Sequence, residues 1–196
     1  NMKFKIEKDS RISNSLLLNG RTFEDLKNDL RRNRDLFKPD NVQIAGPIKD
    51  SLVQFIQNDL LQRKPHYLCA QILSANLNTG EPTSKFPKLR AQIISRGKED
   101  DDCGHILACS LGGKMLDFNL FPQEKNTNRG WKGMWFHWRL FEWLIKKWLE
   151  TMKNAQVNFE VILNYNDSNY PNRPDSGVFS IEFICDEDGK EREDES

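Results

Sequence analysis

The sequence lacks several features that mark other classes of protein. Its apolar runs are too short to span a bilayer, and no apolar segment follows the first residues, so we expect neither a membrane anchor nor a signal peptide. There is no internal repeat or low-complexity linker, which favours a single domain. The cysteines show no disulfide framework, and we expect reduced thiols in a cytosolic setting at Cys69, Cys103, Cys109 and Cys185.

Excess charge of one sign is also absent, because the formal net charge is zero. That zero hides an asymmetry: residues 186–196 hold seven acids and two bases, so the remaining residues carry a net charge of plus five. We expect the acidic end to be a disordered tail. A modestly basic body permits nucleic-acid binding but does not establish it.

Hydrophobic periodicity predicts helices in the first third of the chain and strands after it. We expect helices over 23–37, with Thr22 as N-cap, and over 48–61, behind Pro47. The sequence predicts strands over 67–73, 89–94, 157–164 and 178–185, with 106–109 as a candidate strand extension beside His105. This order of elements indicates an α+β domain.

The strongest helix signal covers residues 127–153, where aromatic residues recur three and four positions apart. We interpret this aromatic stripe as core packing rather than a surface for base stacking. Phe136, Leu140 and Trp143 lie off the stripe, and we expect them to pack against the N-terminal helices.

Polar residues that periodicity does not explain gather between 102 and 128. Asp102 and Gly104 come just before His105 in the sequence. Asn119 and Asn128 come after it, one on each side of Pro122. A neutral imidazole can take a proton from water near pH 7, and carboxamide oxygens suit hard cations such as magnesium. Asn128 also lies near the expected start of a helix, where it could be only a cap, but where a phosphate would also be favoured.

These residues resemble the signature of the DNA/RNA non-specific endonucleases of the His-Me finger (ββα-metal) class. The matching motifs are Asp102-Cys103-Gly104-His105, Asn119 through Gln123, and Asn128-Arg129-Gly130. The toxin-type branch is the most similar, since Gly112-Gly113 and a late Arg173-Pro174 also match. The resemblance implies a ββα-metal core with a small antiparallel sheet and one long aromatic-rich helix.

The same resemblance assigns roles to individual residues. It implies that His105 is the general base that activates water and that Asn128 binds magnesium, with manganese as an alternative. Asn119 would be a second metal-site residue, acting through water or by holding the histidine strand in place. Arg90 or Arg129 would contact the scissile phosphate. The products would carry a 5′ phosphate.

Two positions depart from the pattern. Cys103 stands where relatives often have an arginine, and Trp135 or Phe136 stands where they commonly place a metal-site glutamate. His137 and Glu142 are nearby substitutes, although neither is a clean match. With the resemblance included, we expect an N-terminal helical region over 1–65, the nuclease domain over 66–185 and the acidic tail over 186–196.

Three alternatives remain beside a non-specific nuclease. Cys103, His105 and Cys109 could bind zinc, but no fourth ligand lies nearby. The missing glutamate suggests a catalytically inactive nucleic-acid-binding or regulatory domain on the same scaffold. Sequence-specific cleavage is disfavoured because there is no helix-turn-helix or finger module.

The toxin-type branch often forms the end of a secreted bacterial effector whose immunity protein blocks it. The resemblance therefore implies an immunity protein as a partner beside DNA or RNA, and action in the cytoplasm of the target. It does not decide between DNA and RNA.

Overall fold

The computed structural model describes residues 2–9, 20–56, 62–125 and 136–186. A six-stranded sheet runs through the whole molecule in the order β1-β8-β7-β4-β3-β2, and every neighbouring pair is antiparallel. Its strands are β1 (Met2–Asp9), β2 (Val42–Ala45), β3 (Ile48–Phe55), β4 (Arg63–Leu73), β7 (Gln156–Asn164) and β8 (Ser176–Cys185). A second sheet is the hairpin of β5 (Asp101–His105) and β6 (Leu120–Glu124). The α+β prediction is confirmed.

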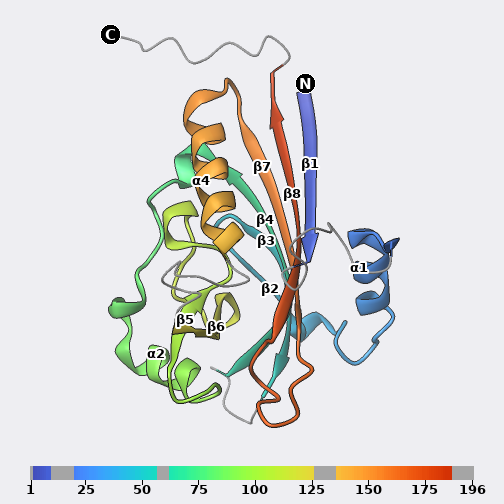
Figure 1. Ribbon diagram of the computed structural model, residues 1–196, viewed down its shortest axis with the longest axis vertical. Helices are drawn as coiled ribbons and strands as arrows, with labels where there is room; N and C mark the ends of the chain where they lie inside the picture. Colours follow the sequence, from blue (N-terminus) through green and yellow to red (C-terminus); the bar gives the residue numbers. More distant parts are fainter. Residues whose placement is uncertain (1, 10–19, 57–61, 126–135, 187–196) are drawn as a thin grey trace.

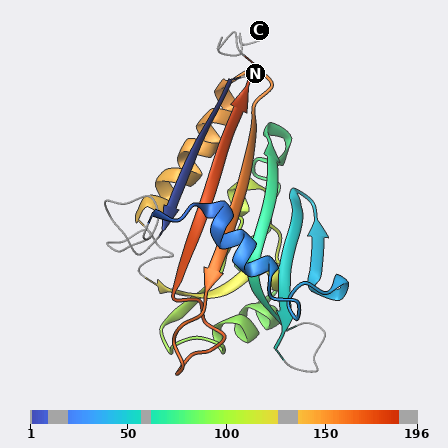
Figure 2. The ribbon, with the colours of Figure 1, turned by 90° about the vertical axis from the view of Figure 1, so that its right-hand side faces the viewer.

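Three α-helices are described: α1 (Phe23–Arg31), α2 (Pro87–Ile94) and α4 (Phe136–Thr151). Short 3-10 turns are η2 (Pro39–Asn41), η3 (Ser74–Asn76), η4 (Thr83–Lys85), η5 (Cys109–Leu111) and η6 (Asp117–Asn119). Figure 1 shows α1 on one face of the large sheet, and α4, α2 and the hairpin on the other. Figure 2 shows α1 lying across the strands. None of the described helices combines the length and apolar character needed to cross a membrane.

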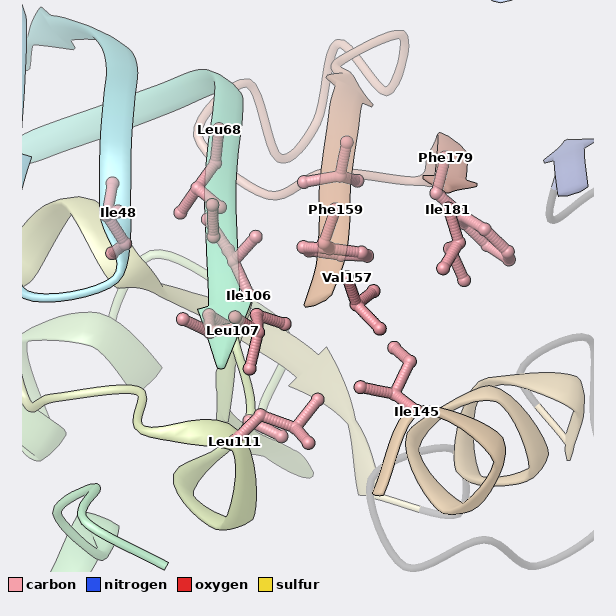
Figure 3. Close-up of a cluster of buried hydrophobic side chains, with 14 of the residues drawn as sticks. Ile48, Leu68, Ile106, Leu107, Leu111, Ile145, Val157, Phe159, Phe179 and Ile181 are labelled. Atoms are coloured by element: carbon pink, nitrogen blue, oxygen red, sulfur yellow. The ribbon is translucent and has the colours of Figure 1, made fainter. Parts of the chain in front are cut away.

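Each face of the sheet has its own apolar core. On the α4 side, alternate residues of β7 (Val157, Phe159, Val161) pack with Ile145 of α4 and with the loop after β5. Figure 3 shows Ile106, Leu107 and Leu111 from that loop between the sheet and α4. The core therefore fixes the chain immediately after His105.

A smaller core lies under α1, where Phe23 and Leu52 pack with Ile162 and Val178 of β7 and β8. Thr22 caps α1 as predicted, because its hydroxyl accepts a hydrogen bond from the Asp25 amide at 3.2 Å. The helix ends at Arg31, earlier than the predicted residue 37.

The predicted helix over 48–61 is wrong for its described part. Residues 48–55 form β3, paired with β2 and β4, and 57–61 lie outside the described residues. The reason is burial on both faces: Ile48 and Val53 face the larger core while Leu52 faces the smaller one. Such a strand has no clean two-residue alternation, and its apolar spacing imitates a helix.

The predicted strand over 89–94 is also wrong, because these residues belong to α2. Pro87 lies in the first turn of this helix, and Leu89 and Ile93, one turn apart, pack on the hairpin. The candidate strand over 106–109 does not form either. Here β5 ends at His105 and a 3-10 turn begins at Cys109.

The predicted packing of the α4 side chains needs correction. Leu140 and Trp143 are 45% and 54% exposed, and α1 lies across the sheet from them, so they do not pack on an N-terminal helix. The predicted strands over 67–73, 157–164 and 178–185 are confirmed within β4, β7 and β8.

The N-terminal third contributes one α-helix and three strands in its described part, rather than only helices. The boundary predicted between residues 65 and 66 falls inside β4.

Candidate active site

The β5–β6 hairpin brings the two predicted motifs together. Gly104 is the register partner of Phe121, and Asp102 is that of Gln123. A Cβ atom on Gly104 would lie 2.2 Å from Oε1 of Gln123, whose side chain is buried across the strand. Glycine before the histidine therefore leaves the space in which the glutamine side chain of the second motif lies.

His105 ends β5, and its ring has a defined orientation. Its Nε2 lies 2.8 Å from the main-chain oxygen of Glu81. A carbonyl oxygen can only accept, so Nε2 carries the proton and Nδ1 keeps the lone pair. Burial lowers the pKa of His105, and the Glu81 carbonyl partly opposes this. Among the described residues Nδ1 has no hydrogen-bond partner, so it is the ring nitrogen able to accept a proton.

Asn119 fixes the loop that follows His105. Its carboxamide oxygen accepts from the Leu107 amide at 2.8 Å, and its Nδ2 donates to the carbonyls of Leu107 at 3.1 Å and Lys114 at 3.0 Å. The side chain is fully buried, with 0% exposure. Asn119 is therefore engaged with the main chain on both its donor and its acceptor side.

The Gly112-Gly113 pair lets three segments approach closely. Gly112 has φ +94°, a left-handed conformation that favours glycine. A Cβ on Gly113 would lie 1.7 Å from the Leu107 oxygen. The Gly113 carbonyl accepts from the Glu81 amide at 2.9 Å, and Glu81 in turn holds His105. The glycine pair thus positions the carbonyl that orients the histidine.

Two arginines reach this hairpin from outside it. Arg90 of α2 is partly exposed, with one guanidinium nitrogen 3.9 Å from an Asp102 oxygen. Arg173, from the β7–β8 loop, binds both carboxylate oxygens of Asp101, at 2.6 and 2.9 Å. The Arg173–Asp101 pair ties the start of β5 to the large sheet. It gives the Arg-Pro motif a structural role that sequence reasoning had not assigned.

Other predicted site residues are not placed. Asn128 and Arg129 lie outside the described residues, as does the side chain of His137. Glu142 of α4 lies beside Ile106 and Ala108, just after the histidine. Within the described part of the chain, no three His, Cys, Asp or Glu side chains come together as a metal-binding group. Cys103, His105 and Cys109, considered above as zinc ligands, therefore do not form such a group. Burial raises the pKa of Cys103 to about 11, so this thiol is protonated and packs with Ile93.

The remaining described histidine, His66, has an ordinary structural environment. Its Nε2 lies 3.2 Å from Oε1 of Gln54, and burial lowers its pKa to about 4.

Sequence reasoning missed the contribution of Glu81 to the site. Glu81 acts through its main-chain oxygen, which every residue has, so its side chain gives no signal.

The family model for the DNA/RNA non-specific endonucleases matches residues 72–181, more than half of the chain. The chain belongs to the DNA/RNA non-specific endonuclease family. The match includes the hairpin, His105 and Asn119, whereas β1, β2 and β3 precede it. Membership in this endonuclease family indicates a hydrolase that acts on nucleic acids.

A relative from Dickeya dadantii (strain 3937) is named a probable deoxyribonuclease RhsA. It is 32% identical over 96 residues, which is 49% of this chain. The match spans only 6% of the length of that relative.

Proposed function

We propose that this endonuclease hydrolyses phosphodiester bonds of DNA or RNA with His105 as the general base. The observation that carries this proposal is the 2.8 Å contact between Nε2 of His105 and the Glu81 carbonyl. It leaves Nδ1 as the basic nitrogen, and the pKa lowered by burial keeps the ring neutral at pH 7.

In the proposed reaction, Nδ1 of His105 takes a proton from a water molecule. The water oxygen forms a bond to phosphorus while the bond from phosphorus to the 3′ oxygen breaks, which leaves a 5′ phosphate. The imidazolium that forms stays hydrogen-bonded to the Glu81 carbonyl through Nε2–H. Arg90, with its partly exposed guanidinium, or Arg129 binds the phosphate oxygens.

A magnesium or manganese ion belongs to this proposal, with Asn128 as its protein ligand. Such an ion would stabilise negative charge on the phosphate and on the leaving oxygen. The carboxamide of Asn119 does not fit a direct bond to the ion, because it is buried and bonded to Leu107 and Lys114. We assign Asn119 a positioning role instead, through the loop that follows His105.

The biological setting we propose follows the resemblance to the toxin-type branch of this family. The chain would be the nuclease part of a longer secreted effector, would act in the cytoplasm of the target cell, and would be blocked by an immunity protein. Its substrate would be the DNA or RNA of the target, without strong sequence preference.

The test is cleavage of supercoiled plasmid and total RNA with magnesium or manganese, comparing the wild type with His105→Ala. His66→Ala is the matched control, since His66 lies far from the hairpin in sequence and has its own partner, Gln54. We expect cleavage by the wild type and the control, and a loss of about 100-fold or more in His105→Ala. Equal cleavage by His105→Ala would overturn the role of His105. Absence of cleavage by the wild type would favour the inactive binding domain.

A further inference from the structure

An aromatic side chain lies exposed at the entrance to α2. Phe86 is the residue before the first turn of this helix, and it is 43% exposed. The helix packs its inward residues, Leu89, Ile93 and Ile94, on the hairpin. Phe86 belongs to none of the apolar clusters formed by the described residues.

The segment that carries Phe86 is rich in bases. Residues 82–98 include five lysines and arginines and no acid, while Glu81, just before this segment, pairs with Lys85. The Lys85 ammonium lies 5.4 Å from the centre of the Phe86 ring, and Lys88 is exposed and has no ion pair with any described residue. By contrast Phe37, which is 44% exposed beyond α1, has both acids and bases close in sequence: Asp35, Lys38 and Asp40.

Phe86 is also coupled to the candidate active site through Glu81. The main-chain oxygen of Glu81 holds His105, and its carboxylate pairs with Lys85, the residue before Phe86. Figure 1 shows α2 beside the β5–β6 hairpin. Lys85 and Phe86 therefore follow, by four and five residues, the carbonyl that holds His105.

We propose that Phe86 stacks on an unpaired nucleobase of the substrate, while Lys85 and Lys88 bind the neighbouring phosphates. This inference rests on the proposed nuclease function and narrows its substrate class. An exposed aromatic ring with flanking lysines is the combination that binds single strands, because every base has a π-face and the phosphates need cations. In a duplex the faces of the bases are covered by their neighbours. The protein therefore prefers single-stranded or locally unpaired DNA or RNA.

The experiment measures binding separately from cleavage. All variants are made in the His105→Ala background and kept in EDTA, and fluorescence anisotropy follows a labelled oligothymidylate and a labelled duplex of equal length. We expect Phe86→Ala to weaken single-strand binding roughly 5- to 100-fold, with duplex binding changed less than about 2-fold. Phe86→Trp should retain binding because it keeps a stacking surface. Phe37→Ala is the matched control, with almost the same exposure and with its neighbour Leu36 in the separate core under α1.

A second measurement tests the lysines. Lys88→Gln should weaken single-strand binding and lower the dependence of log K on log salt by about 0.7, the value for one phosphate contact with a single strand.

Single-strand binding by Phe86→Ala equal to that of Phe37→Ala would overturn the inference, even in an active nuclease. Loss of binding in Phe86→Ala would support it even if the wild type proved inactive, so the two proposals can fail separately. Equal losses for single strand and duplex would overturn the preference for unpaired bases. If Phe86→Ala bound nucleic acid as before but no longer bound an immunity protein, Phe86 would belong to a protein interface instead.

Discussion

At the scale of single residues, the orientation of His105 has a consequence for the pH dependence of cleavage. The base must be unprotonated, and burial lowers its pKa below the ordinary value of about 6.5. The value of kcat/KM should therefore be flat above about pH 6.5 and fall only at more acidic pH. The measurement is a pH profile on a short oligonucleotide. A fall that already begins above pH 7 would contradict the role of His105 as a buried neutral base.

Asn119 gives a second residue-scale prediction. In Asn119→Asp the second oxygen would face the carbonyls of Leu107 and Lys114, to which Nδ2 now donates. We expect a loss of about 2–4 kcal/mol in the free energy of unfolding, because buried acceptors would lose their donor and meet a negative charge. Urea denaturation at pH 7 measures this.

Asn166→Asp is the control for Asn119→Asp. Asn166 is exposed, and its Nδ2 lies 3.4 Å from Oδ1 of Asp175. It should change stability by less than about 1 kcal/mol. Equal stability of the two variants would contradict the positioning role of Asn119.

At the scale of elements, the loop that carries Gly112 and Gly113 makes a further prediction. Gly113→Ala would force the main chain away from the Leu107 oxygen and so move the carbonyl that binds the Glu81 amide. We expect a loss of about 1–3 kcal/mol in stability and a larger relative loss of cleavage, because Glu81 orients His105. Thermal unfolding and plasmid cleavage measure the two effects.

Gly46→Ala separates steric overlap from backbone strain. Gly46 has φ +60°, but nothing lies within 4 Å of the added Cβ. It should lose about 1–2 kcal/mol of stability through its left-handed conformation while keeping its activity. Equal plasmid cleavage by Gly113→Ala and Gly46→Ala would contradict the prediction for Gly113.

The elements differ in how well the sequence predicts them, and burial explains the difference. In β7 alternate residues face the larger core and polar residues lie between them, so the two-residue period is visible. In β3 three consecutive residues, Ser51 to Val53, are buried and the register shifts beside them, so the two-residue period is lost. In β1 the alternation of Phe4 and Ile6 with lysines is present, and sequence reasoning overlooked it. The packing of α2 became clear only with the hairpin that its apolar side covers.

The candidate site was predictable where it depends on side-chain identity. His105, Gly104 and Gln123 belong to a recognisable motif, and the structure brings the last two into contact. The orientation of His105 was not predictable, because Glu81 acts through its main chain. The Asp101–Arg173 pair joins residues far apart in the sequence, and only the fold shows that they meet.

At the scale of the whole molecule, the match to the endonuclease family is shorter than the folded unit. A fragment of residues 72–181 lacks β1, β2 and β3 and nearly all of β4, the strand paired with β7. It also lacks Phe23 and Leu52, which cover Ile162 and Val178. We therefore expect the fragment to show no cooperative thermal unfolding and no near-ultraviolet circular dichroism, whereas residues 2–186 show both. A fragment that melts cooperatively would contradict the structural role of the N-terminal strands.

The pairing of β1 with β8 also determines how the molecule responds to force. Met2 is the register partner of Cys185, so the first residue of β1 lies beside the last residue of β8, and the two strands run antiparallel from there. Tension applied between these ends would load one hydrogen-bonded pair at a time, beginning at Met2 and Cys185, instead of all pairs at once. The sheet would therefore unzip at low force from this edge, before the load reaches β4, the strand that contacts β6 of the hairpin.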